Sequence, residues 1–149
     1  MQLRSESNPA LNTVTAYGDD YIEINATAYQ HAVCFGPEGD IRPWPVSTVQ
    51  DITADLLWQA AGLTQVRPDP MAFLDGNDAP VKPHDAPEIL LVGTGLNQHF
   101  LAAEITRTLL SMGIGIEAMS TQAAARTYNI LMAEGRRVVA ALLPLEPTS

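Results

Sequence analysis

The C-terminal part of the chain constrains the fold most, because short apolar runs alternate there with segments of helical periodicity. The apolar runs are Ile89–Val92, Ile114–Met119 and Val138–Leu143. Residues 98–112 and 121–134 between them are expected to form helices, ended by Gly113 and Gly135. Strands that are apolar throughout belong to parallel sheets buried on both faces. The pattern therefore predicts a βαβαβ half of an α/β domain.

The N-terminal part is rich in β-forming residues. Thr13–Gly18 and Tyr21–Tyr29 flank two aspartates that are typical of a turn, which predicts a β-hairpin. Polar and apolar residues alternate along the second run, the period of one half-buried strand. His31–Phe35 is expected to be a further strand. We therefore expect a single compact α/β domain, with an N-terminal β-hairpin half followed by βαβαβ, in a central mixed sheet flanked by helices.

The segment between these halves has mixed signals. Ser47 is expected to open a helix that runs to Ala61, with Gln50 at capping-box spacing. Trp44 stands between two prolines in an extended stretch, and the sequence leaves open whether it fills the core or lies exposed as an anchor.

The expected organisation is a flexible tail over residues 1–12 and one domain over 13–149, with a proline-rich loop or insertion at 64–87. That stretch holds five of the eleven prolines. A chain of 149 residues is long enough to bury a core as one domain. No apolar run approaches the ~20 residues of a membrane span, and the polar start has no signal-peptide core. We expect a cytoplasmic protein.

Charge limits the partners. The net charge is −9 and the single cysteine is Cys34. Nucleic-acid and anionic-lipid binders usually present a basic face, so neither partner is expected, and a cysteine-based metal cluster is excluded. The acidic excess lies in residues 1–87 and almost disappears after them, so an anionic ligand would bind in the C-terminal part.

The sequence Gly93-Thr94-Gly95 lies where a nucleotide-binding turn would lie, after a strand and before a helix. Gln98 replaces the third glycine of the dinucleotide fingerprint, and no P-loop Gly-Lys-Ser/Thr is present. We interpret the glycines as a strand-to-helix turn, since a tight turn needs their conformational freedom. A small anion at the amides of that helix N-terminus stays open.

The expected helix 121–134 carries polar residues on one side, with Gln122, Arg126 and Asn129 spaced by four and three. A crevice opens at the carboxyl ends of strands in α/β sheets. The predicted ligand or partner crevice is therefore formed by Gly93, Thr94, Gly95, Thr121, Arg126, Tyr128 and Asn129. A solvated Arg126 that ties a loop is an equal alternative.

Several segments of the chain resemble a known protein family. The segments NTVTAYGDDYIEIN, RPWPV, ILLVGTG and MGIGIEAMSTQAAARTYNILMAEGRRVVAALL resemble bacterial relatives of the mitochondrial respiratory complex I assembly factor 3 family. The run Arg126–Asn129 followed by Ala133–Arg137 is the most specific part. The resemblance implies a compact α/β domain with a central mixed sheet and flanking helices. It also implies a role like that of the mitochondrial members, which help to build a membrane-embedded respiratory enzyme through protein contacts.

Three departures from the family pattern matter. Residues 64–87 resemble an insertion. Asn97 and His99 stand where many relatives carry basic residues, which weakens any phosphate-binding prediction. Ala125 stands where relatives often have cysteine, which excludes a thiol nucleophile at that position.

Catalytic signals are weak. No Gly-x-Ser-x-Gly elbow is present, and His31, His84 and His99 share no metal-ligand spacing. Cys34 is expected to be a small buried hydrophobe. We therefore expect no catalytic residues, no cofactor and no metal, and a non-catalytic protein-binding or assembly domain with a protein partner. The alternative is a small-ligand, nucleotide or anion-binding protein that uses the same crevice.

Overall fold

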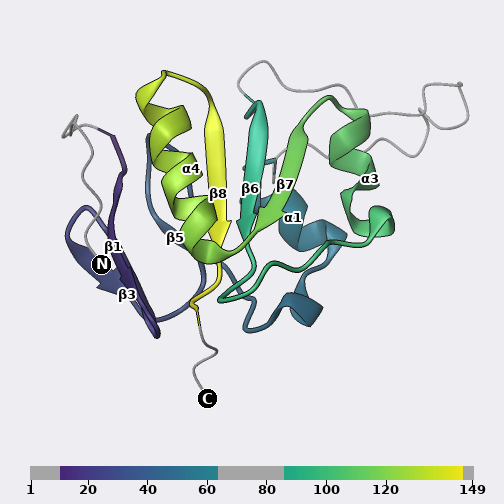
Figure 1. Ribbon diagram of the computed structural model, residues 1–149. Helices are drawn as coiled ribbons and strands as arrows, with labels where there is room; N and C mark the ends of the chain where they lie inside the picture. Colours follow the sequence, from purple (N-terminus) through teal and green to yellow (C-terminus); the bar gives the residue numbers. More distant parts are fainter. Residues whose placement is uncertain (1–10, 64–85, 146–149) are drawn as a thin grey trace, which may run out of the picture.

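The computed structural model describes residues 11–63 and 86–145. The strands are β1 (Val14–Gly18), β2 (Tyr21–Ile24), β3 (Thr27–Tyr29), β4 (Val33–Phe35), β5 (Arg42–Pro43), β6 (Ile89–Gly93), β7 (Gly115–Met119) and β8 (Val138–Leu142). The helices are the 3-10 turn η1 (Val49–Asp51), α1 (Ala54–Ala60), α3 (Ala103–Ser111) and α4 (Thr121–Ala133). They form one mixed α/β domain (Figure 1).

The main sheet has five strands in the order β5-β4-β8-β6-β7. β6 pairs in parallel with both β7 and β8, while β4 runs antiparallel to β8. Leu90 and Val92 of β6 pack in the core cluster of α1 and α3, and Leu91 packs in that of α4. The predicted α/β class, with a mixed sheet buried on both faces, is confirmed.

The N-terminal strands differ from the prediction, because they form a separate sheet. β1, β2 and β3 make a three-stranded antiparallel meander that does not join the main sheet. The single strand expected over 21–29 is broken by a tight turn at Asn25 and Ala26, both at positive φ. Asn25 holds the turn, since its Oδ1 accepts from the Thr13 amide at 3.0 Å. The alternation of buried side chains therefore ends at Ile24.

The meander packs against α4, which lies between it and the main sheet on one face (Figure 1). Asn129 of α4 pairs with the backbone of β1 as a neighbouring strand would. Its Oδ1 accepts from the Val14 amide at 3.0 Å, and its Nδ2 donates to the Val14 carbonyl at 2.9 Å. All of these atoms are buried.

The helix expected from Ser47 to Ala61 is split. Thr48 caps the short turn η1, and the backbone is extended at Ile52 before Thr53 caps α1, accepting from the Leu56 amide. The predicted capping box at Ser47 and Gln50 is therefore wrong, because the caps lie one and six residues after Ser47. Gly62, at φ +80°, ends this segment as expected.

Trp44 belongs to the core. It is 3% exposed, and its indole Nε1 donates to the Leu56 carbonyl at 3.0 Å. The exposed-anchor alternative is excluded by this burial.

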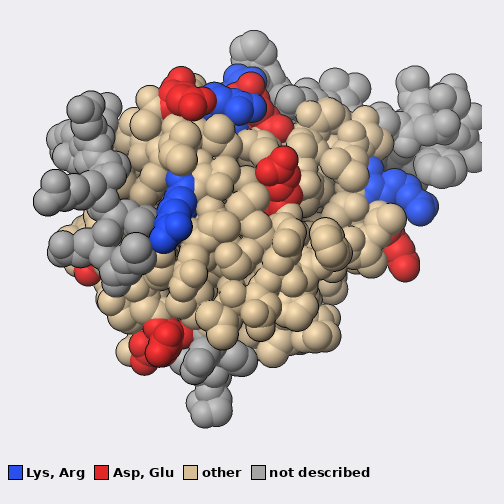
Figure 2. All heavy atoms as spheres, viewed as in Figure 1, with Lys and Arg blue, Asp and Glu red and all other residues tan. Residues whose placement is uncertain are grey.

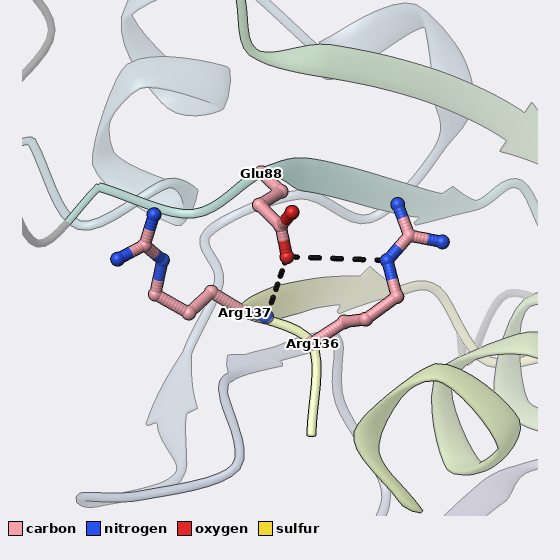
Figure 3. A network of polar contacts seen from close by, with 3 residues as sticks. All are labelled: Glu88, Arg136 and Arg137. Carbon is pink, nitrogen blue, oxygen red and sulfur yellow. Dashed lines mark hydrogen bonds and ion pairs between the residues drawn. The ribbon is translucent and has the colours of Figure 1, made fainter. Parts of the chain in front are cut away.

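The starts of β6 and β8 are joined by a polar contact (Figure 3). Glu88 Oε2 accepts from the Arg137 amide at 3.1 Å and lies 3.9 Å from Arg136 Nε. The Glu88 and Arg136 side chains are 43% and 45% exposed, so solvent screens this pair and its contribution stays below about 1 kcal/mol. The two arginines of the family-like motif thus lie at the amino-terminal ends of the central strands, opposite the glycine turn at their carboxyl ends.

Two expected segments fall largely outside the described residues, namely residues 1–10 of the tail and 64–85 of the proline-rich loop. At their margins, Asn12 is buried and its Nδ2 donates to the carbonyls of Gly36 and Gly39, and Ala86 is part of the core.

Candidate functional site

The glycine turn at the end of β6 is fixed by hydrogen bonds within the protein. The Thr94 amide donates to the Met119 carbonyl at 2.8 Å, and the Leu96 amide donates to the Leu145 carbonyl at 2.9 Å. Gly93 is closely packed, since a Cβ there would lie 2.8 Å from Leu142 Cδ2 and 2.9 Å from Thr121 Oγ1. The glycines permit close contact between chain segments.

Thr121, the first residue of α4, bridges this turn to β8. Its Oγ1 accepts from the Gly95 amide at 2.9 Å and donates to the Leu143 carbonyl at 2.6 Å. Its own amide donates to the Gly95 carbonyl at 2.8 Å. The side chain is fully buried.

The interpretation of Gly93–Gly95 as a turn directly into a helix is wrong. Gly95 takes φ +97°, and the bond from Leu96 to Leu145 leads the chain into an extended loop. α3 begins only at Ala103, five residues later than expected. The N-terminus of α3 therefore does not follow the glycines directly, and the amides of residues 94–96 are already bonded within the protein. The turn lacks the free donors that hold a phosphate.

A hollow of about 340 Å³ nevertheless opens beside the turn, at the carboxyl ends of β6 and β8. It is lined by Ser47, Thr48, Val49, Gln50, Thr94, Gly95, Leu96, Asn97, His99, Leu143, Pro144 and Leu145. No Lys or Arg side chain is among these lining residues, so the hollow offers an anion no permanent positive charge.

The amides at the start of η1, on the rim of this hollow, are also occupied. Asp51 Oδ2 accepts from the Ser47 amide at 3.1 Å and from the Thr48 amide at 3.0 Å. These bonds, with that of Thr48 first, lower the pKa of the Asp51 carboxyl. The protein's own carboxylate fills the position that an exogenous anion would take.

The lowered pKa predicts a pH-dependent contribution to stability. A carboxyl whose folded pKa is depressed stabilises above its unfolded value, about 3.9, and loses that effect as pH falls through the folded pKa. We expect Asp51→Ala to lower the melting temperature at neutral pH, and the deficit to shrink as pH is lowered below about 4. Thermal unfolding followed by circular dichroism across pH checks this. Asp20→Ala, at an exposed turn, controls for the lost charge; an equal deficit at every pH would contradict the assignment.

The predicted crevice residues fall into two places. Gly93, Thr94, Gly95 and Thr121 lie together at the turn, and Thr94 and Gly95 line the hollow. Arg126, Tyr128 and Asn129 instead lie on α4 toward the meander.

These three α4 side chains hold the meander in place. The Tyr128 hydroxyl donates to the Asn12 carbonyl at 2.8 Å, and its ring meets Phe35 edge-on at 4.8 Å. Burial raises the pKa of Tyr128 far above the usual tyrosine range. Arg126, exposed on the surface, donates from Nη2 to the Tyr17 hydroxyl at 3.2 Å. The polar residues of α4 thus make the contact with β1 and the residues just before it. The distance between these two segments in the sequence gave no indication of this contact.

The described residues contain little that points to catalysis. No group of three or more His, Cys, Asp or Glu among them could hold a metal ion. Cys34 is buried as expected, and burial raises the pKa of its thiol despite the opposing charge of Arg42. His84 lies outside the described residues. Nor is any described helix long and apolar enough to cross a membrane.

A second depression, not anticipated from the sequence, lies beside β7. We call it the β7 groove: about 450 Å³, lined by Gln98, Phe100, Leu101, Thr106, Leu110, Ile116, Glu117, Ala118 and Met119. Phe100 is 87% exposed and Leu110 52%. Residues 98–112 were expected to form one helix, but α3 begins at Ala103, so Phe100 lies in the exposed loop before it.

Fold and site together define a small mixed α/β domain, with a neutral hollow at the strand ends and an apolar groove at one sheet edge. A solution structure of a Mth938-like domain from Bordetella pertussis is 60% identical in sequence, with a TM-score of 0.79. The match covers 99% of this chain and 95% of that one. The chain belongs to the protein family of unknown function DUF498/DUF598, whose model matches residues 14–143.

Curated relatives match over shorter stretches. An uncharacterized protein of Rhodobacter capsulatus is 47% identical over 58 residues, 39% of this chain and 47% of that protein. The NADH dehydrogenase (ubiquinone) 1 alpha subcomplex assembly factor 3 of Danio rerio is 40% identical over 57 residues, 38% of this chain and 33% of that protein. The match therefore spans less than half the length of these relatives. The predicted resemblance to the assembly factor family is confirmed.

Proposed function

We propose that this chain is a non-catalytic, cytoplasmic protein-binding domain that acts in the manner of an assembly factor, through the β7 groove. The observation that carries the proposal is the exposure of Phe100, at 87%, beside the partly exposed Leu110. A large exposed aromatic residue in an apolar depression is typical of an interaction surface. The likeness to assembly factor 3 of respiratory NADH dehydrogenase supports a protein as the partner.

The glycine turn supports the same proposal by what it lacks. Its amides are bonded within the protein, and the hollow beside it has no cationic lining residue. In this proposal Thr94 and Gly95 contribute a neutral rim to the partner surface. Gly93 and Thr121 support that rim from below, while Tyr128 and Asn129 keep α4 in place.

The proposal is tested by affinity capture from the source cell's lysate with a Phe100→Gln/Leu110→Gln double variant. Glutamine keeps the helix propensity of leucine nearly unchanged. Ile130→Gln is the matched control, since Ile130 is 59% exposed on α4 and does not line the groove. We expect the double variant to lose a reproducible set of captured proteins by about tenfold or more, and the control to retain them.

Equal capture by both variants would overturn the groove as the binding surface. Melting temperatures of the parent chain, the double variant and the Ile130→Gln control show whether each variant is folded. Because the changed side chains are exposed, we expect free energies of unfolding within about 0.5 kcal/mol of the parent.

The hollow at the strand ends favours a second candidate function, the binding of a small ligand. Its place, at the carboxyl ends of parallel strands β6 and β8, is where α/β sheets usually bind ligands. Titration with inorganic phosphate, nucleotides and neutral metabolites, followed by amide chemical shifts of Thr94 and Gly95, tests it. A saturable shift at these amides would establish a ligand function.

A further inference from the structure

The open edge of β7 has a defined hydrogen-bonding pattern. The Gly115 amide donates to the Glu88 carbonyl, and the Met119 carbonyl accepts from the Thr94 amide. The backbone groups of Gly115 and Met119 therefore face β6. Backbone groups alternate in direction along a strand, and those of Ile116 and Ala118 therefore face away from the sheet. No strand of the described residues pairs with this side.

One outward group is covered by a side chain. Gln98 Nε2 donates to the Ala118 carbonyl at 2.9 Å, and Gln98 is itself exposed. A side-chain amide in this position replaces one hydrogen bond of a missing neighbouring strand. Covering an edge in this way is one means by which proteins limit unwanted pairing. A single hydrogen bond contributes little net stability, so the backbone amide of an added strand can replace the Gln98 side chain.

The two faces beside this edge differ in chemistry. Ile116 and Ala118 pack on the side of α1 and α3, where Phe100 and Leu110 extend the apolar surface of the groove. On the other side, Glu117 is exposed in the middle of the strand. Figure 2 shows that the surface around α4 and β7 is broad and mostly uncharged, with few charged side chains.

From this arrangement we infer that the β7 edge accepts an extended segment of a partner protein, as an added strand, in which apolar residues alternate with basic ones. The inference rests on the proposed protein-binding function and names the kind of segment that is bound. Side chains of the added strand alternate between the two faces. Its apolar residues contact Phe100 and Leu110, and its basic residues lie beside Glu117.

Charge selects this partner over a second copy of the chain. An isologous pair of β7 strands would bring the two Glu117 side chains opposite or diagonal to each other, and like charges across strands are destabilising. β7 itself, Gly115–Met119, contains no basic residue that would offset them. The net charge of −9 further favours a cationic partner.

The test uses fluorescent, capped peptides of about eight residues, roughly the length of a short strand. One alternates valine with lysine, a second valine with glutamate, and a third is the lysine peptide with proline replacing two valines. Binding to the full chain is followed by anisotropy, and the amides of Ile116 and Ala118 by hydrogen exchange. We expect the lysine peptide alone to bind with saturation and to slow exchange at both amides.

The Glu117→Lys variant provides the decisive comparison. This variant replaces an attractive cross-strand charge with a repulsive one. We expect the affinity for the lysine peptide to fall by about tenfold and the affinity for the glutamate peptide to rise. Glu134→Lys, changed at an exposed acid at the end of α4, controls for net charge and is expected to change affinity little. Both sites are exposed, so folding is preserved. Ala118→Pro, which removes an outward amide at a position where an edge strand tolerates proline, is expected to abolish binding.

Several results would overturn the inference. Peptide binding that is equal for Glu117→Lys and Glu134→Lys, or that leaves the Ile116 and Ala118 amides unprotected, would exclude strand addition at this edge. A dimer of the parent chain at micromolar concentration, dissociated by the peptide, would assign the edge to a second copy. If lysate capture still depends on Phe100 and Leu110 while no peptide binds, the protein-binding function stands and only the strand-addition inference fails.

Discussion

Replacing Asn129 with leucine is expected to lower the free energy of unfolding by about 3 kcal/mol, because it leaves two buried backbone groups without partners. The Val14 amide and carbonyl bond only to the Asn129 side chain on that side of β1, at 3.0 and 2.9 Å. Leucine has a similar volume and no hydrogen-bonding atoms. The loss therefore reports the missing polar contacts rather than a cavity.

Urea unfolding followed by circular dichroism measures this change, and hydrogen exchange locates it. Exchange at the amides of β1 is expected to increase more than exchange at β6, since α4 stays packed on the main sheet. Ile130→Ala, at the next and largely exposed residue, controls for altered helix content. A loss below about 1 kcal/mol would mean that the meander is held chiefly by its apolar contacts.

Thr121→Val is expected to be destabilising by about 2 to 4 kcal/mol although it preserves side-chain shape. The Thr121 hydroxyl accepts from the Gly95 amide and donates to the Leu143 carbonyl, and both groups are buried. Valine leaves each of them unpaired at the point where β6, β8 and α4 meet. The glycine turn is then expected to exchange its amide hydrogens faster.

Thr121→Ser distinguishes the contribution of the Thr121 hydroxyl to stability from that of its methyl group. Serine retains the two hydrogen bonds and loses one buried methyl, so we expect a loss of only about 1 kcal/mol. The order parent, serine, valine in urea midpoints checks the assignment. If serine is as destabilising as valine, packing against Gly93 is the dominant contribution of Thr121.

The alternating apolar runs were sufficient to predict the three parallel strands β6, β7 and β8, because strands buried on both faces need continuous apolar sequence. Helix ends were also readable, since Gly62, Gly113 and Gly135 all take the positive φ that ends a helix. These are local signals, and each depends on a few neighbouring residues.

The site was harder to predict because its determinants are distant in sequence. From the sequence, Asn129 is expected to be a polar residue on a helix surface. It is buried because it bonds to the backbone of Val14, 115 residues away. From the sequence, Gly95 is expected to lead directly into a helix. The amide of its neighbour Leu96 instead donates to the Leu145 carbonyl, and the chain stays extended. A single sequence contains no periodicity that reveals such pairs.

The contact between α4 and β1 has a consequence for how the chain is made. Its polar bonds join residues 115 and 116 positions apart, from Asn129 to Val14 and from Tyr128 to Asn12. Such non-local contacts slow folding, since a long loop must close before they form. The meander leaves the ribosome about a hundred residues before α4, the helix that packs with Ile22 and Ile24 in one core cluster. A nascent chain that stops before residue 121 therefore presents uncovered apolar strands, and is the species most prone to aggregate.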